Sequence, residues 1–296
     1  MIRAPSQSAP RGGGYPPWQS AFAADALRRA WTAVRANRGT AGADGATLAR
    51  FEKDLAANLT ALRRELLDGS YRPHRVTQVL VPKGDDDWRP ISLWTVRDRV
   101  AQRAVYNYLE GPFEARFLPC SYGFRPGRTT QTAAQAVAQA RRAGARWVVD
   151  ADIKDCFGTM DSARLLDLLG AWAVPEPVRR LIGRWLQAKV WNGWAGRRTA
   201  GTSQGGVISP LLCNAYLHPF DEALQGRGRT LVRYADDFVV LTADERAAGR
   251  AREASETALS RLGLALHPEK THLTTFDKGF QFVGWFFVRD EMYQLR

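Results

Sequence analysis

The chain has 296 residues, of which 45% are hydrophobic and 24% charged, so it can bury an ordinary core and is not a disordered tail. It carries 42 Lys and Arg against 30 Asp and Glu, a formal net charge of +12. Residues 1–200 hold 31 basic and 18 acidic side chains, whereas residues 201–296 hold 11 and 12. A basic front on a nearly neutral back indicates a polyanionic partner such as nucleic acid, and a general bias toward arginine explains the excess about as well.

Several classes of protein are excluded. No apolar run approaches the ~18 residues of a membrane-spanning helix, and the first residues lack the apolar segment of a signal peptide. The three cysteines, Cys120, Cys156 and Cys213, lie far apart without CxxC spacing, which argues against a disulfide framework or a zinc site. We therefore expect a cytoplasmic protein with no membrane partner.

The first half of the chain reads mainly as helices. A Pro-, Gly- and Ser-rich start predicts a disordered tail over residues 1–20, followed by a helix from about Phe22 to Ala36. Apolar residues at three- and four-residue steps from Leu48 to Leu66 predict one amphipathic helix that ends at Asp68-Gly69. Two strands, at 75–83 and in RPISL (89–93), then flank an acidic turn. Further helical patterns lie at 96–110, 129–143, 162–170 and 177–189.

The second half mixes strands and helices. VVDADI (148–153) predicts a buried strand that runs into carboxylates, and LVRYADDFVVL (231–241) predicts a hairpin with acidic residues at its tip. Ser209-Pro210 predicts a helix with Ser209 as its N-cap, and Pro219 is expected to end or kink it. A helix at about 245–262 follows, and GFQFVGWFFV (279–288) closes the chain as a strand. Without regular βαβ alternation, the fold class is expected to be α+β.

The acidic residues of these strands are the first candidate site. Asp236 and Asp237 are adjacent acids that repel each other in an apolar hairpin, and Asp150 and Asp152 point to one face of their strand. Each pair alone is also typical of a solvated turn or strand end. If the two strands lie side by side, their oxygens form a set that suits Mg²⁺ and phosphoryl transfer.

Several motifs together resemble the reverse transcriptases of bacterial group II introns and their group II-like relatives. They occur in the order and approximate spacing of that family, from about residue 31 to 287. The motifs are NRGTAGADG (37–45), LLDGSYRP (66–73), VPK and RPI (81–83 and 89–91), SYGFRPGR (121–128), DIKDCF (152–157), SQGGVISPLLCNAYL (203–217), YADDF (234–238), HPEKT (267–271) and FVGW (282–285).

The resemblance implies roles for individual residues. Asp152, Asp236 and Asp237 match the metal-binding catalytic carboxylates, whereas Asp150 has no family role. Phe157 matches the aromatic steric gate that favours deoxynucleotides. Lys270 matches the position proposed to protonate the leaving pyrophosphate, and because lysine releases a proton more readily than arginine, it is our candidate general acid.

Other matched residues concern substrate binding. The resemblance implies that Lys83, Arg89, Phe157, Gln204 and Gly205 bind the incoming nucleotide. For the template it implies contacts of Arg125 and Arg128, and the same role is expected of Arg35 and Arg38. The sequence departs from the family at Ser203, where proline is usual, and at RPISLW (89–94), which stands where RPLGIP is commoner.

The resemblance also implies a right-hand polymerase fold with an antiparallel palm sheet backed by helices. Residues 21–145 would form the fingers with a helical N-terminal extension and 146–296 the palm, with 203–215 at the nucleotide pocket between them. No thumb or maturase segment follows, so low processivity is expected unless a protein partner supplies the thumb's function.

The predicted function is RNA-directed DNA polymerase. It would use two Mg²⁺ ions, with Mn²⁺ as the alternative, to add dNTPs to a DNA or RNA primer on an RNA template. A catalytically inactive RNA-binding splicing or assembly factor and an RNA-dependent RNA polymerase are the alternatives. Intron, CRISPR and antiviral defence settings stay open.

Overall fold

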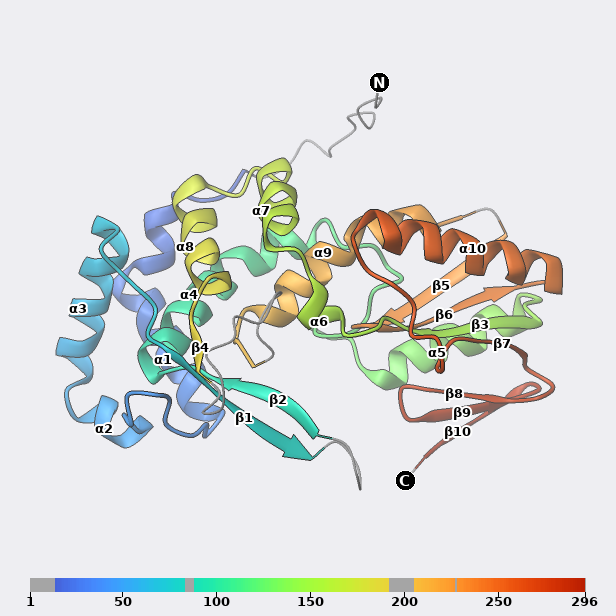
Figure 1. Cartoon of the computed structure of the whole chain (residues 1–296), viewed down its shortest axis with the longest axis horizontal. Helices are drawn as coiled ribbons and strands as arrows, with labels where there is room; N and C mark the ends of the chain where they lie inside the picture. Colours follow the sequence, from blue (N-terminus) through green and yellow to red (C-terminus); the bar gives the residue numbers. More distant parts are fainter. Residues whose placement is uncertain (1–13, 83–87, 192–204, 227, 296) are drawn as a thin grey trace.

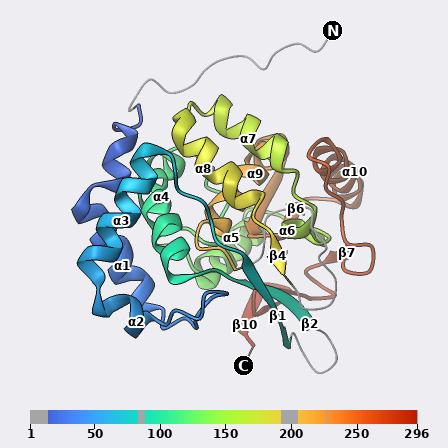
Figure 2. The same cartoon turned by 60° about the vertical axis from the view of Figure 1, so that its left-hand side comes forward.

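The N-terminal part of the protein is a group of helices. The structure is a computed structural model that describes residues 14–82, 88–191, 205–226 and 228–295. In it, α4 packs along α1 and against η1 (Figure 1), and Figure 2 brings this end of the molecule forward. These first elements are η1 (Trp18–Phe22), α1 (Ala24–Ala36), α2 (Leu48–Lys53), α3 (Leu55–Asp68) and α4 (Val96–Glu114).

A small sheet extends from these helices. Its order is β2-β1-β4, with β1 and β2 antiparallel and β4 parallel to β1. Its strands are β1 (Val76–Pro82), β2 (Trp88–Leu93) and β4 (Val190–Trp191). Both predicted strands are therefore present as an antiparallel pair, which projects from the helices in Figure 1.

The C-terminal part is built on a four-stranded antiparallel sheet with the order β5-β6-β3-β7. β5 and β6 form the predicted hairpin, in which Tyr234 pairs with Asp237. β3 pairs with β6 along its whole length. The strands are β3 (Trp147–Asp152), β5 (Arg229–Tyr234), β6 (Asp237–Thr242) and β7 (His272–Thr275).

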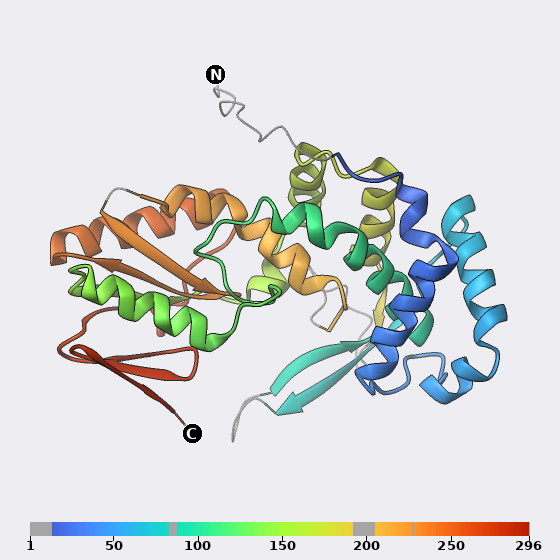
Figure 3. The same ribbon diagram turned by 180° about the vertical axis from the view of Figure 1, so that it is seen from behind.

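Both faces of this sheet are covered. Val149 and Val240 belong to the main core, which also contains side chains of α9 and α10, whereas Val148 and Val239 pack in a second core with α5. Figure 3 shows α5 along the back of the sheet. Burial on both faces explains why these strands are continuous apolar runs. The remaining helices are α5 (Thr130–Arg142), α6 (Cys156–Thr159), α7 (Ser162–Ala171), α8 (Glu176–Leu186), α9 (Ser209–Leu224) and α10 (Glu245–Arg261).

The C-terminal strand predicted over 279–288 is wrong in extent, because this segment folds back on itself. It forms β8 (Phe280–Phe282) and β9 (Trp285–Val288), and β10 (Glu291–Gln294) completes a sheet of order β10-β9-β8. Val283 and Gly284 form the turn with φ of 46° and 80°. Two consecutive positive φ angles are what a tight hairpin turn requires, and a valine at one of them gave no turn signal.

Two helix predictions are also corrected. The helix expected from Leu48 to Leu66 is interrupted at Asp54, which ends α2 and precedes α3. There the side chain of Asn58 donates a 2.9 Å hydrogen bond to the carbonyl of Phe51, which the break leaves free. The predicted end of α3 is confirmed, since Gly69 caps it with φ of 77°.

The helix at Ser209 starts where expected but is capped differently. Ser209 is the first helical residue, so Ile208 takes the N-cap position, and no side chain caps the helix there. Pro219 does not end α9, which continues to Leu224 with Leu217, Phe220 and Leu224 buried in the core. Packing on both sides of the proline thus outweighs its local penalty.

The N-terminal tail is shorter than predicted within the described residues. Residues 1–13 lie outside them, but Trp18–Phe22 form η1, and Phe22 is buried. Tyr15 stacks on Tyr108 with ring centroids 6.0 Å apart, which ties this segment to α4. Aromatic side chains therefore order a stretch that its composition assigned to the tail.

Helices and strands are mixed as expected, which confirms the α+β class. Among the described residues, none of the helices combines the length and the apolar character needed to cross a membrane. All three cysteines are free and buried. Cys156 and Cys213 come together in the core, with their sulfur atoms 4.0 Å apart.

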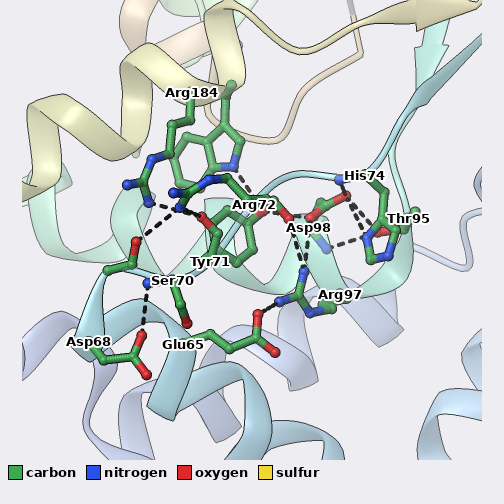
Figure 4. A network of polar contacts seen from close by, with 12 residues as sticks. Glu65, Asp68, Ser70, Tyr71, Arg72, His74, Thr95, Arg97, Asp98 and Arg184 are labelled. Carbon is green, nitrogen blue, oxygen red and sulfur yellow. Dashed lines mark hydrogen bonds and ion pairs between the residues drawn. The ribbon is translucent and has the colours of Figure 1, made fainter.

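A buried carboxylate ties α4 to the chain before β1 (Figure 4). Asp98 accepts hydrogen bonds from the hydroxyls of Tyr71 at 2.5 Å and Thr95 at 2.7 Å, and from the backbone nitrogen of His74 at 3.1 Å. The Tyr71 hydroxyl in turn accepts a 3.0 Å bond from Trp185 of α8. Burial raises the pKa of Asp98, but its hydrogen bonds lower it by more, so the group stays charged.

We expect Asp98→Ala to lower the free energy of unfolding by about 3 kcal/mol, because it leaves buried donors unpaired. Urea denaturation measures the change. Glu256→Ala, which removes the exposed ion pair with Arg252 on α10, is the matched control and should cost less than about 0.5 kcal/mol. Equal losses in the two variants would contradict a structural role of Asp98.

Candidate active site

Two pairs of acidic residues lie at one end of the four-stranded sheet. Asp152, the last residue of β3, pairs directly with Asp237, the first residue of β6. Asp236 stands in the β5–β6 turn, and its carbonyl accepts a 3.1 Å hydrogen bond from the backbone nitrogen of Ile153. The two acid-ended strands are therefore neighbours, which is the arrangement that the sequence hypothesis required.

Three of the carboxylates are on one face of the sheet. Asp150 and Asp152 share that face because they are two residues apart on β3, and Asp237 shares it as the pairing partner of Asp152. Burial raises the pKa of Asp237 to about 7, and the charges of Asp150, Asp152 and Asp236 add to the effect. Burial likewise raises the pKa of Asp150 to about 6. The end of the sheet thus has an excess of negative charge that favours a cation.

Lys270 supplies one cation to this site. Its Nζ donates a 2.7 Å hydrogen bond to Oδ2 of Asp152. The segment before Lys270 is held against the end of β3, since the backbone nitrogen of His267 donates to the carbonyl of Asp152 at 2.8 Å. The hydrogen bond to Asp152 raises the pKa of Lys270, with burial opposing. The candidate general acid therefore lies in contact with a candidate metal ligand.

The carboxylates are adjacent without forming a closed set of ligands. Within the part of the chain that the structure describes, no three His, Cys, Asp or Glu side chains are grouped so that they could hold a metal ion. Lys270 holds the Asp152 carboxylate as the side chains stand. Joint coordination by Asp152, Asp236 and Asp237 would therefore require side-chain rotation.

The predicted steric gate follows β3 immediately. Phe157 lies on the single turn α6 and packs, half-buried, against the main core. A sharp bend precedes it, because Asp155 has φ of 42° and its side chain caps α6 by accepting from the backbone nitrogen of Gly158 at 3.2 Å. This bend keeps Phe157 close to the end of the strand that carries Asp152.

The predicted nucleotide pocket brings the start of α9 against β2. Gly205 has φ of 105°, and a Cβ there would be 2.5 Å from the carbonyl oxygen of Ser92. The backbone nitrogen of Val207 donates a 2.8 Å hydrogen bond to Oε1 of Gln102 on α4. The glycine turn therefore depends on close backbone approach, which explains the absence of side chains there.

Arg89 is exposed on β2, the strand that Gly205 touches. Arg89 is three residues from Ser92, which the glycine turn contacts. Lys83 and Gln204, the other two predicted nucleotide-binding residues, lie outside the described residues, as does Ser203.

Arg125 faces the interior and not the surface. It is 8% exposed and pairs with Glu114, with Nε and Nη2 within 2.9 Å of Oε2. Its Nη1 donates to the carbonyls of Leu118 and Ser121 at 2.8 and 2.9 Å. These contacts hold its charge inside the fold, so we leave Arg125 out of the nucleic-acid surface.

The other three predicted template contacts are more accessible. Arg128 is half-buried over the ring of Tyr122, 4.9 Å from its centroid, and donates to the carbonyl of Pro119 at 2.6 Å. Arg35 is exposed and 3.2 Å from Glu52, and Arg38 is exposed with φ of 48°.

The sequence reasoning missed one ion pair beside the acidic turn. Arg233 and Asp221 are both fully buried, and the side chain of Arg233 reaches the carbonyl of Ala235, the residue before Asp236. The available signal was an arginine within an apolar strand, since arginine is almost never fully buried without a partner.

Comparison with a solved structure defines the class of fold. The structure of apo telomerase from Candida tropicalis matches 75% of this chain and 49% of its own, with a TM-score of 0.62 and 12% sequence identity. At that identity the likeness concerns the fold alone. It confirms the predicted right-hand polymerase fold.

The chain belongs to the family of the Reverse transcriptase (RNA-dependent DNA polymerase), which matches residues 81–287. Protein YkfC of Escherichia coli K12 is 30% identical over 290 residues, 84% of this chain and 76% of YkfC. Group II intron-encoded protein LtrA of Lactococcus lactis is 37% identical over 161 residues, 54% of this chain and 27% of LtrA. The predicted resemblance to group II intron proteins is confirmed, although the chain spans only about a quarter of LtrA.

The raised pKa of Asp237 gives a pH dependence of stability with a definite sign. The folded protein holds this proton more tightly than the unfolded chain, so in metal-free buffer the wild type loses stability as pH rises from 3.8, the ordinary pKa, to about 7. Asp237→Asn removes the buried charge, so it should melt higher than the wild type at pH 8, and the difference should vanish below the ordinary pKa. Thermal melts with EDTA measure this. Equal melting temperatures at pH 8 would contradict the assignment.

Proposed function

We propose that this protein is an RNA-directed DNA polymerase that adds dNTPs to the 3′-OH of a primer on an RNA template. The observation that carries the proposal is the pairing of Asp152 with Asp237 at the end of β3 and β6, with Asp236 in the adjoining turn, in a chain of the reverse transcriptase family. A binding protein has no evident use for repelling carboxylates held together on one sheet edge.

We propose that Asp152, Asp236 and Asp237 hold two Mg²⁺ ions, with Mn²⁺ as the alternative. The donor set fits, because hard carboxylate oxygens suit these ions and Asp237, whose pKa is raised first by burial and then by its acidic neighbours, lies among like charges. When bound, such ions stabilise the attacking and leaving oxygens of phosphoryl transfer. In this structure the ammonium of Lys270 neutralises Asp152. Released from Asp152, it would be available to donate a proton to the leaving pyrophosphate.

The nucleotide is proposed to bind between β2 and the glycine turn. Arg89 would bind the triphosphate as a planar fork, together with Lys83. Gly205 would let the backbone, with Gln204, approach the nucleotide, and Phe157 would press against C2′ of the sugar and exclude a 2′-OH.

We further propose that residues 21–145 act as fingers and 146–296 as palm, with 203–215 at the nucleotide pocket. Arg35, Arg38 and Arg128 would contact the phosphates of the RNA template, in keeping with the basic excess before residue 201. Arg35 and Arg38 are exposed and Arg128 is half-buried, so their charged ends can reach phosphates in such salt-dependent contacts.

A non-catalytic RNA-binding factor on the same scaffold is the second candidate. It is favoured by one observation, namely that the ammonium of Lys270 neutralises the carboxylate of Asp152, a candidate metal ligand. An RNA-dependent RNA polymerase is disfavoured by the aromatic ring of Phe157.

Asp236→Ala is expected to abolish extension of a DNA primer on poly(rA) with dTTP and Mg²⁺, because it removes a metal ligand. A gel-based extension assay measures the product. Asp167→Ala, an exposed acid on α7, is the matched control and should retain activity. A wild type without Mg²⁺-dependent product would favour the RNA-binding factor, and incorporation of UTP in place of dTTP would favour the RNA polymerase.

Lys270→Arg is expected to lower the single-turnover rate on the order of 100-fold, because arginine keeps the charge but does not release a proton. Rapid-quench measurement at saturating dTTP gives this rate. Lys278→Arg, which changes an exposed lysine between β7 and β8, serves as the control. An unchanged rate for Lys270→Arg would refute the general acid role.

A further inference from the structure

Arg233 lies at the centre of a buried polar cluster behind the acidic turn. Its side chain and that of Asp221 on α9 are both 0% exposed. The two form a double hydrogen bond, with Nε to Oδ1 and Nη2 to Oδ2 each 2.6 Å. Burial lowers the pKa of Arg233, but the Asp221 carboxylate raises it by more, so the net shift is upward and the pair is ionic.

The remaining donors of Arg233 bind three further residues. Nη1 donates to Oδ1 of Asn214 at 3.0 Å and to the carbonyl of Ala235 at 2.8 Å, and Nη2 donates to Oγ of Ser121 at 2.8 Å. With the two bonds to Asp221, all five N–H groups of the guanidinium are used. One side chain thus connects α9, the segment at 120–123 and the β5–β6 turn.

The backbone of the same segment is held against β5. The nitrogen of Tyr122 donates to the carbonyl of Arg233, and the nitrogen of Arg233 donates to the carbonyl of Cys120, each at 2.8 Å. A Cβ on Gly123 would overlap the backbone nitrogen of Ala235, and the Gly123 carbonyl accepts a 2.8 Å bond from Asn214. The segment and the turn are therefore in direct backbone contact.

The turn that these contacts hold is strained. Ala235 has φ of 60°, a left-handed conformation that an alanine adopts at a cost of about 1–2 kcal/mol. Such conformations persist where the surroundings fix them. The carbonyl of Ala235 belongs to the peptide that leads into Asp236, so the bond from Arg233 fixes the direction in which the Asp236-Asp237 backbone leaves the turn.

We infer that Arg233, with Asp221 and Asn214, is the positioning unit of the acidic turn and sets the placement of Asp236 for the proposed polymerase reaction. This inference rests on the proposed function for its effect on rate, but the geometry that it assigns to the turn does not. Buried ion pairs can often be replaced by apolar residues of similar size without loss of stability. Such an apolar pair in place of Arg233 and Asp221 could not, however, bind the carbonyl of Ala235.

Two variants test the unit. Arg233→Lys keeps the charge but cannot make the double bond to Asp221 together with the bonds to Ala235 and Asn214. Asn214→Ala removes the acceptor for Arg233 and the donor to the Gly123 carbonyl but leaves the ion pair in place, so it serves if Arg233→Lys does not fold. The control is Arg141→Met. It removes another buried arginine, which lies on α5 behind the four-stranded sheet and pairs with Asp290 at 3.1 Å.

Two readouts are compared. In single-turnover primer extension on poly(rA), both variants should lower the maximal rate on the order of 100-fold, as for a displaced catalytic group, with the dTTP concentration at half-maximal rate within about two-fold of wild type. In hydrogen exchange followed by mass spectrometry, protection should fall over 229–240 and 120–125 and stay at wild-type level elsewhere. Arg141→Met should change neither.

The outcomes separate the two proposals. Wild-type rate and wild-type exchange in a folded Asn214→Ala protein would overturn the positioning unit. So would exchange that rises uniformly over the chain. If the wild type makes no product, the polymerase proposal fails, and the exchange data alone decide whether Arg233 holds the turn.

Discussion

The repulsion between carboxylates at the end of β3 and β6 is the constraint on which the rest of the site depends. The pairing of these strands is set by their apolar residues, Val148 and Val149 against Leu241 and Val240, and it brings Asp152 and Asp237 face to face as a consequence. Burial of the strands thus stabilises an arrangement that electrostatics opposes. Burial raises the pKa values of Asp237 and Asp150, and the neighbouring carboxylates add to the effect, so any cation that enters relieves the repulsion.

Two cations already reach this end of the sheet, and they do different things. Lys270 approaches from the outer side, contacts a carboxylate directly and stays partly accessible. Arg233 comes from the core side, is paired with Asp221 and touches only backbone at the turn. The first is thus suited to exchange with an ion or to move a proton, and the second to hold geometry, because a fully used guanidinium has no donor left for a substrate.

Polar contacts connect the N-terminal helix α4 to the turn before α9 and to α8. The glycine turn before α9 touches β2 and α4 through backbone atoms, and Asp98 fixes the base of the β1–β2 hairpin to α4 and, through Tyr71, to α8. Arg89 thus lies on a hairpin whose base is tied to two helices by hydrogen bonds.

Ordered motifs and apolar periodicity are local signals, and they predicted the family, the fold class and most helices and strands. They also singled out the two acid-ended strands that pair in the structure. The sequence did not determine the break at Asp54, the course of α9 through Pro219, or the hairpin at Val283, where tertiary packing or an unusual φ outweighs local preference. The exposure of individual arginines depends on tertiary contacts. Arg125 and Arg233 point inward because of their partners, Glu114 and Asp221, which sequence spacing does not reveal, although the position of Arg233 within an apolar strand is a local signal that it is buried.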